Sequence, residues 1–246
     1  MKHTIIQDTW TEDDDIDLLD YVKKNNIDTK FLSEGEILNT DLSKINVLFS
    51  DTDIVQKMIN PQCVPNCYPN VFKELYDREI KIVKVKDLLN LDKPFFVKPL
   101  ENDKSFEAHI IKTNYDIQFM VDDFKEKNIN DDDNVYYSSL VNFVNEYRLF
   151  IGHKKLYGMV ESTELLIDPS KAKSVVPSQE FINKVLQINP YDFCVIDIGC
   201  VSDSTHDKWS IVEVNPSFAL TSYDWNIEKY YKYCEDAWIY YVSKSV

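Results

Sequence analysis

The spacing of apolar residues changes near residue 92, which restricts the chain to folds made of two differently organised parts. Before this point, strand-like runs alternate with helix-like segments: strands at 4–7, 29–32, 45–49 and 80–85, and helices at 12–25 and 71–76. Alternation of this kind predicts a small parallel α/β layer. We expect this layer to be a scaffold, because no group of chemically reactive side chains is concentrated in it.

After residue 92, strand-like segments follow one another with few helices between them. We expect strands at 94–99, 105–112, 135–141, 146–151, 155–161, 192–201 and 209–214, and helices at 115–127, 178–187 and 227–242. Such an order is typical of α+β architecture, with a hairpin turn at Gly152-His153. A chain of 246 residues can bury a sizeable core, and we predict three parts, at 1–92, 93–140 and 141–246.

Glycine is scarce, and this excludes two large classes of nucleotide site. The four glycines are Gly35, Gly152, Gly158 and Gly199, and neither GxGxxG nor GxxxxGK[ST] can be drawn through them. The dinucleotide and P-loop cradles need such glycines for close approach of the backbone to phosphates. A phosphate site in this chain must therefore use side chains.

The charge balance and the cysteines limit partners and compartment. With 27 Lys and Arg against 42 Asp and Glu, the chain carries a net charge of −15, which disfavours binding to nucleic acid or an anionic membrane. The sequence contains no run of roughly 18 apolar residues, so it predicts no membrane span. The odd number of five cysteines suits a reducing compartment, so we expect a cytoplasmic protein. Cys63 and Cys67 have ligand-like spacing, but buried thiols are favoured over zinc ligands.

The segment IVEVNP at 211–216 indicates a metal site. Side chains alternate along a strand, so Glu213 and Asn215 lie on one face about 7 Å apart. A carboxylate and an amide oxygen so placed can share a hard cation such as Mg²⁺, which keeps other positions for water and phosphate. The alternative is a half-exposed sheet in which polar residues merely alternate.

Asp197, inside the apolar run CVIDIG, is a third candidate ligand. If Ser202 pairs with Lys208 across an antiparallel turn, Asp197 lies opposite Glu213 and on the same face. A register shifted by one residue would move Asp197 to the wrong face. An acidic residue among buried apolar neighbours favours the metal interpretation over the half-exposed sheet.

Three cations could neutralise phosphates at such a site. Lys98 and Arg148 lie within apolar strand-like runs, and Lys104 lies in the turn after Lys98. Each also has a structural interpretation: a lysine at a strand end can extend to solvent, and Arg148 can pair with Glu146 on its own strand. Together they supply the cations that a glycine-poor phosphate site requires.

The order of these segments resembles the ATP-grasp superfamily. The resemblance covers residues 93–220 and is carried by Lys98 in PFFVKP, Glu146 and Arg148 in NEYRLF, Asp197 in VIDIG, and Glu213 and Asn215 in VEVNP. It implies a fold in which two α+β lobes grip ATP after a small amino-terminal α/β domain. It also implies ATP and Mg²⁺ as cofactors.

The resemblance implies a role for each matching residue. Lys98 would contact the phosphates, and Arg148 would stabilise the transferring phosphoryl group. Ribose would lie near Glu146. Magnesium would be held by Asp197, Glu213 and Asn215. Adenine would meet backbone groups of the strand that joins the lobes, at Ser139, Leu140, Val141 and Asn142.

Two departures from the common pattern limit what the resemblance carries over. The loop at 100–106 reads LENDKSF, whereas many relatives have a glycine-rich loop over the phosphates. In this respect the chain is similar to a small clade of phage and bacterial proteins, in which a second lysine, here Lys104, takes part. Glu161 stands where several peptide ligases have a basic residue. The substrates of those ligases therefore cannot be assigned to this chain.

The implied reaction moves the γ-phosphoryl group of ATP to a carboxylate. The resulting acylphosphate is then attacked by an amine or a thiol, so the implied partners are small-molecule or peptide carboxylates and amines. Charge neutralisation and in-line positioning are the main needs, and no covalent protein nucleophile is required. An assembly chaperone that binds ATP without ligase turnover remains an alternative, as does an acidic α/β protein without a nucleotide site.

Overall fold

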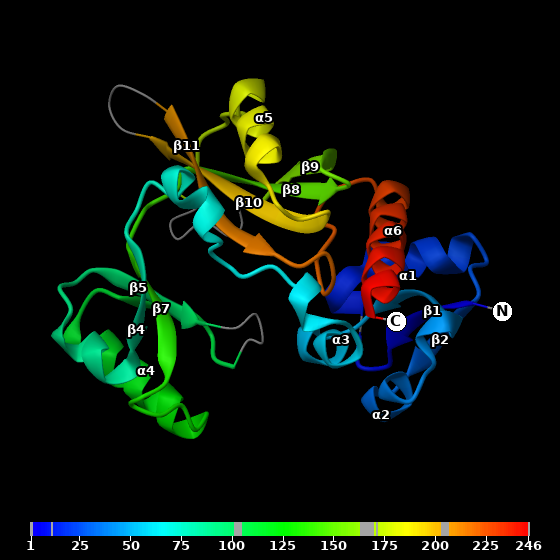
Figure 1. The fold of residues 1–246 in the computed structure, drawn as a ribbon, viewed down its shortest axis with the longest axis horizontal. Coiled ribbons are helices and arrows are strands. Elements are labelled where there is room, and N and C mark those ends of the chain that lie inside the picture. Colours follow the sequence, from blue (N-terminus) through cyan, green and yellow to red (C-terminus); the bar gives the residue numbers. More distant parts are fainter. Residues whose placement is uncertain are drawn as a thin grey trace.

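The computed structural model describes residues 2–10, 12–100, 105–162, 170, 172–202 and 207–245, and their strands form three sheets. Figure 1 shows these sheets as separate bodies, which we call the amino-terminal domain, the first lobe and the second lobe. Lys104 lies outside the described residues. None of the helices in the described part of the chain is long and apolar enough to cross a bilayer.

The amino-terminal domain is the predicted parallel α/β layer. Its central strand β1 pairs in parallel with both neighbours, and apolar side chains of β1 and β3 are buried. Two short helices, α2 and α3, have no counterpart in the prediction. The elements are β1 (His3–Gln7), α1 (Glu12–Lys24), β2 (Thr29–Leu32), α2 (Glu34–Leu38), β3 (Ile45–Phe49) and α3 (Thr52–Met58).

The first lobe is an antiparallel sheet of order β4-β7-β5-β6, covered on one face by helix α4. Its elements are β4 (Ile80–Lys84), β5 (Phe95–Pro99), β6 (His109–Ile111), α4 (Asn114–Glu126) and β7 (Asn134–Ser139). The placement of the strand at 80–85 in the parallel layer is wrong, because β4 pairs antiparallel with β7. Alternating side chains look the same in either sheet, so the sequence could not choose the partner.

The second lobe is an antiparallel sheet of order β11-β10-β8-β9 with an apolar core on each face. The predicted hairpin joins β8 to β9, and its turn residues are His153 and Lys154, both with positive φ. One core lies under α5. The elements are β8 (Asn145–Gly152), β9 (Lys155–Glu161), α5 (Gln179–Ile188), β10 (Phe193–Ser202) and β11 (Asp207–Asn215).

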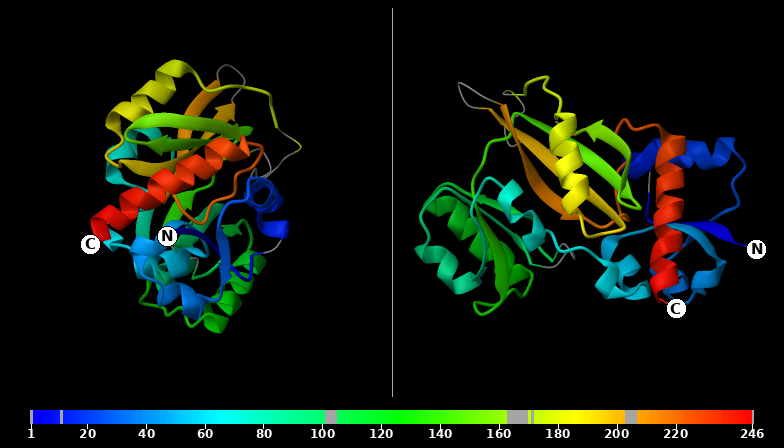
Figure 2. Two further views of the ribbon diagram at one scale, coloured as in Figure 1. Left: turned by 90° about the vertical axis from the view of Figure 1, so that its right-hand side faces the viewer. Right: turned by 45° about the horizontal axis from the view of Figure 1, so that its top comes forward.

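The last helix, α6 (Ile227–Ser245), lies between the second lobe and the amino-terminal domain (Figure 2). Tyr230 and Tyr233 are fully buried in a core that also contains side chains of β1, β3 and β8. The Tyr231 hydroxyl lies 2.5 Å from the Thr4 hydroxyl of β1. The tyrosines of α6 therefore pack the second lobe against the amino-terminal domain.

The connection between the amino-terminal domain and β4 runs along the edge of β11. The Val214 N–H donates to the carbonyl oxygen of Cys67 at 2.9 Å, and the Ser210 hydroxyl donates to that of Tyr76 at 2.6 Å. The helix expected at 71–76 is a 3₁₀ helix, Asn70–Leu75. An edge strand exposes unpaired backbone groups, and this connection covers them.

Candidate active site

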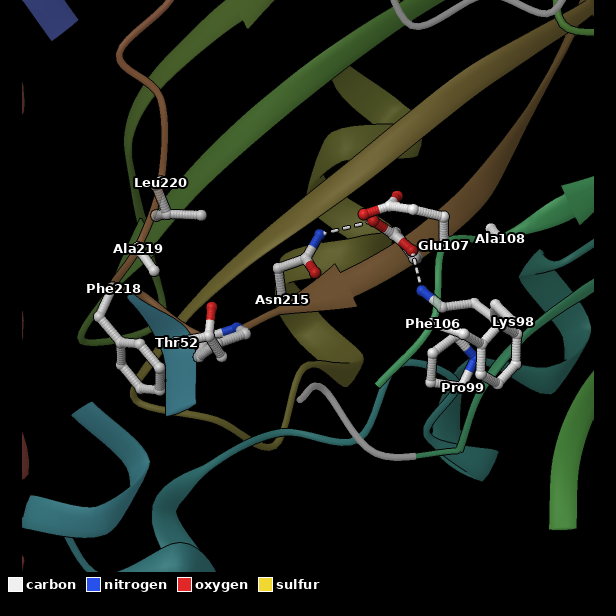
Figure 3. A pocket seen from close by; sticks show the side chains of 12 residues that line it. Thr52, Lys98, Pro99, Phe106, Glu107, Ala108, Asn215, Phe218, Ala219 and Leu220 are labelled. Carbon is white, nitrogen blue, oxygen red and sulfur yellow. Dashed lines mark hydrogen bonds and ion pairs between the residues drawn. The ribbon is translucent and has the colours of Figure 1, made fainter. Parts of the chain in front are cut away.

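A pocket of about 220 Å³ opens where the three bodies meet. The amino-terminal domain contributes Thr52, the first lobe Lys98 and Phe106, and the second lobe Glu213 and Asn215. Figure 3 shows the Lys98 and Asn215 side chains turned toward one another across this space. Three of the sequence-predicted metal and phosphate residues, Lys98, Glu213 and Asn215, therefore line one opening between the lobes.

Asp197 lies directly opposite Glu213 in the β10–β11 ladder, as predicted, but the predicted turn register is wrong. Ser202 pairs with Asp207 instead of Lys208, which is a shift of one residue. A β-bulge between Asp197 and Ile198 compensates for this shift, so that Asp197 and Glu213 share a face. Sequence reasoning could not find the bulge, because alternation alone assumes one continuous register.

Arg148 binds Asp197 in a two-pronged ion pair. The Arg148 Nε and Nη2 atoms donate to the two Asp197 carboxylate oxygens at 2.8 and 2.9 Å. The two side chains are 9% and 2% exposed. Burial opposes the charged form, but the Asp197 carboxylate outweighs it and raises the pKa of Arg148. The alternative pairing of Arg148 with Glu146 is not formed, because Asp197 on the neighbouring strand faces the guanidinium directly.

Asn215 joins the two carboxylates. Its Nδ2 atom donates to Asp197 Oδ2 at 3.0 Å and to Glu213 Oε1 at 2.9 Å. The three predicted metal ligands are thus one hydrogen-bonded group on one face of the sheet.

Lys98 connects this group to the first lobe. Its Nζ atom lies 2.5 Å from Glu213 Oε2, and the two side chains are 14% and 26% exposed. Burial alone would lower the pKa of Lys98, yet the Glu213 carboxylate raises it overall. Conversely, burial would raise the pKa of Glu213, but Lys98 lowers it. Both side chains are therefore charged at neutral pH, and each stabilises the other across the opening between the lobes.

Glu146 is a third carboxyl group near the cluster. It lies two residues before Arg148 on β8, and its residue surface is 5% exposed. Burial, followed by the charges of Asp197 and Glu213, raises its pKa to about 8. At neutral pH the group is therefore largely protonated. The ribose contact expected for Glu146 remains a prediction.

The residues expected to meet adenine lie in the connection between the two lobe sheets. Ser139 ends β7, and its N–H donates to the Glu79 carbonyl oxygen at 3.0 Å. Leu140 and Val141 are half-buried and Asn142 is exposed. Next to them, the Phe143 ring covers Gly199, where an added Cβ would come within 2.3 Å of the ring. Contact of this connection with adenine remains a prediction.

Sequence reasoning assigned no role to Tyr223 or Arg78. The Tyr223 ring lies 4.9 Å from the Arg148 guanidinium carbon, and Tyr223 has a positive φ of 48°. Strained backbone of this kind is concentrated at functional sites. Arg78 contacts β11 at the bulge. The signal available for Arg78 was that the chain has only two arginines, the other being Arg148.

The group Asp197, Glu213 and Asn215 fits a hard divalent cation by its chemistry, since each side chain has an oxygen that can serve as a ligand. Of the two carboxylates in this group, Glu213 is the more accessible, with 26% of its side chain exposed, and Asn215 is half-buried. Among the described residues, no group of three or more His, Cys, Asp or Glu side chains is arranged as a metal site, and metal binding by Asp197, Glu213 and Asn215 remains a prediction. Cys67 is buried and Cys63 is half-buried, and the preference for ordinary thiols over zinc ligands remains a prediction.

Comparison with known families tests the resemblance to the ATP-grasp superfamily. Residues 75–233 match the family model described as the ATP-grasp domain, R2K clade family 2, which is more than half of the chain. The chain belongs to this ATP-grasp family. The resemblance drawn from Lys98, Arg148, Asp197 and VEVNP is therefore confirmed at the level of the family.

Solved structures share the ATP-grasp fold with this chain. A RimK domain protein of ATP-grasp type from Sphaerobacter thermophilus aligns with a TM-score of 0.55 and 7% identity, over 98% of this chain and 99% of that one. The D-cycloserine synthetase DcsG aligns with a TM-score of 0.55 and 10% identity, over 97% and 100%. No curated protein matches the chain. At these identities the likeness concerns the fold alone.

Proposed function

We propose that this ATP-grasp protein is a ligase that transfers the γ-phosphoryl group of Mg-ATP to a carboxylate. The acylphosphate so formed reacts with an amine to give an amide or peptide bond. The observation that carries the proposal is the junction of Lys98 from the first lobe with Glu213, Asn215, Asp197 and Arg148 from the second. These groups match the needs of phosphoryl transfer, which are charge neutralisation and positioning.

Each charged side chain has a role in this proposal. When the nucleotide binds, the Lys98 ammonium group leaves the Glu213 carboxylate and contacts the phosphates. A phosphate oxygen accepts a hydrogen bond from an ammonium group as a carboxylate oxygen does. Arg148 is held in place by Asp197 and stabilises charge on the transferring group. Magnesium would be held by Asp197, Glu213 and Asn215, and when bound it neutralises phosphate charge.

Two cysteines of β10, Cys194 and Cys200, are unsuited to act as covalent nucleophiles. Burial raises the pKa of Cys194 to about 12 and that of Cys200 to about 11. A thiol attacks only as the thiolate, which these values exclude at neutral pH. Direct transfer from ATP to the substrate carboxylate is the route that the site supports.

The carboxylate substrate fits the side of the pocket away from the cluster. Apolar side chains line the pocket on the far side of Asn215, among them Phe218 and Leu220 (Figure 3). The proposed acceptor is therefore a small molecule or the end of a peptide, with an apolar part beside its carboxylate.

The test is ADP release in the presence of Mg-ATP and mixtures of carboxylates and amines. A ligase releases ADP and phosphate only when both substrate classes are present, and mass spectrometry of the mixture identifies the amide. Glu213→Gln should reduce turnover at least tenfold while it leaves the fold intact, because the residue faces the opening. Tight ATP binding without turnover in any mixture would contradict the ligase and support a nucleotide-binding assembly protein.

A further inference from the structure

Arg78 makes a contact with β11 that a regular strand does not allow. Its Nη1 atom donates to the Ile211 carbonyl oxygen at 2.8 Å, and its Nη2 atom donates to the Val212 carbonyl oxygen. Successive carbonyl groups of a regular strand point to opposite edges of that strand. One guanidinium can reach both carbonyl oxygens because β11 bulges here, so Arg78 binds the bulged form of the strand specifically.

This bulge places the metal-binding group on one face. From the turn to Ile198, each residue of β10 pairs with a residue of β11 in one register, and Ile198 pairs with Ile211. Continuing that register would pair Asp197 with Val212 and turn Glu213 to the opposite face. The observed pairing of Asp197 with Glu213 therefore depends on Val212 being the extra residue.

Arg78 is itself held from three sides. Its Nε atom donates to the Ser138 hydroxyl of β7 at 3.1 Å, and Nη1 also donates to the Tyr76 carbonyl oxygen at 3.1 Å. The rings of Tyr68, Tyr76 and Phe143 lie 5.6 to 5.8 Å from its guanidinium carbon. A planar guanidinium can make these directed contacts at once, whereas a lysine ammonium cannot.

We propose that Arg78 is a positioning residue of the nucleotide site. By binding the Ile211 and Val212 carbonyl oxygens, it holds the bulge that keeps Glu213 and Asn215 on the same face as Asp197. Through Ser138 it also connects this part of the second lobe to the first lobe. The consequence for catalysis rests on the proposed function, in which the three side chains hold the metal.

The first experiment measures amide hydrogen exchange in the protein without nucleotide. Arg78→Met removes every donor but keeps a long side chain, and it should speed exchange at residues 212–215 about tenfold. Lys208→Met is the matched control, because Lys208 of β11 contacts Asp77 of the same connection but lies away from the bulge. The control should change exchange at 212–215 less than about twofold.

The second experiment measures binding of Mn²⁺-ATP by electron paramagnetic resonance. Loss of a residue that orients metal ligands weakens metal binding by roughly 10- to 100-fold, and we expect this for Arg78→Met. Arg78→Lys keeps the charge and serves if the methionine variant does not fold. It should show a smaller loss of binding together with a smaller rise in exchange at 212–215.

The proposal is overturned if amide exchange at 212–215 is the same in Arg78→Met as in the wild-type protein. If Arg78→Met does not fold, the same criterion applies to Arg78→Lys. This holds even when binding is lost, since Arg78 would then contact the nucleotide directly. If the wild-type protein binds no Mn²⁺-ATP, the proposed function fails, and the exchange rates still decide whether Arg78 holds the bulge. Faster exchange with weaker binding in the same variant supports both.

Discussion

The two lobes contribute to the candidate site in different ways. Among the described residues, the second-lobe sheet supplies Glu146, Arg148, Asp197, Glu213 and Asn215, whereas β5 of the first lobe supplies Lys98. Arg148, Asp197, Asn215 and Glu213 are joined by hydrogen bonds within the second lobe, whereas Lys98 meets Glu213 across the opening between the lobes. The second lobe is therefore an assembled half-site, and the first lobe completes it.

This difference follows from where the charges lie. Asp197 is 2% exposed and is enclosed by the two apolar cores of the second lobe, so its charge must be compensated within the protein. Two carboxylates, of Asp197 and Glu213, balance two cations, of Arg148 and Lys98, while protonated Glu146 adds no charge. Variants of the buried Arg148–Asp197 pair should therefore affect stability, and variants of Lys98 should affect ligand binding.

The largest expected effect is that of Asp197→Ala on stability. It leaves the Arg148 guanidinium, 9% exposed, without its carboxylate partner. Breaking a buried ion pair by removing one partner costs about 3–5 kcal/mol. Urea denaturation followed by circular dichroism measures the free energy of unfolding. A loss below about 1 kcal/mol would contradict the view that the second lobe balances its own charges.

The second prediction concerns pH and Glu146. Its pKa is about 8 in the folded protein against an ordinary value of 4.5, so the folded state holds the proton more tightly than the unfolded chain. Between these values the free energy of unfolding falls as pH rises. Glu146→Gln should remove this dependence, worth roughly 3 kcal/mol between pH 5.5 and 8. Denaturation of both proteins at the two pH values tests it, and parallel pH profiles would refute it.

Lys98→Ala tests the first-lobe side of the comparison. Loss of a charged hydrogen bond to phosphate costs roughly 1.5–3 kcal/mol, so the dissociation constant of Mg-ATP should rise about tenfold to a hundredfold. Isothermal titration calorimetry measures this value. The control is Lys125→Ala, a surface lysine of α4 in the same lobe, 69% exposed. An unchanged constant for Lys98→Ala would remove Lys98 from the site.

The smallest effect is expected for Asp123→Asn in the first lobe. Asp123 lies 2.9 Å from His109 on the helix-covered side of the sheet, and neither residue is among the described side chains that line the pocket. The amide can keep a hydrogen bond to the ring, so we expect a loss of about 1 kcal/mol or less. Thermal denaturation should show a small shift, and Mg-ATP affinity should stay within about twofold. A large fall in affinity would mean that the first lobe contributes more than Lys98.

Local patterns were sufficient to predict most elements of the fold. Strands at 45–49 and 146–151 and the helix at 115–127 follow from alternation and helical spacing, and the structure has β3, β8 and α4 at these places. The partner of β4 was not predictable, because its alternating side chains suit either sheet. Pairing between strands is decided by contacts between distant segments, which a single sequence does not record.

The sequence by itself determined which side chains the site can use: Lys98, Arg148, Asp197, Glu213 and Asn215 stand out as polar groups in apolar strands. Only the tertiary structure decided how they are paired. Arg148 binds Asp197 and not Glu146, because Asp197 faces it on the neighbouring strand. The shared face of Asp197 and Glu213 depends on the bulge in β11, which Arg78 binds from a distant segment. Composition and periodicity act along the chain, whereas register and charge pairing are fixed by groups that meet only after folding.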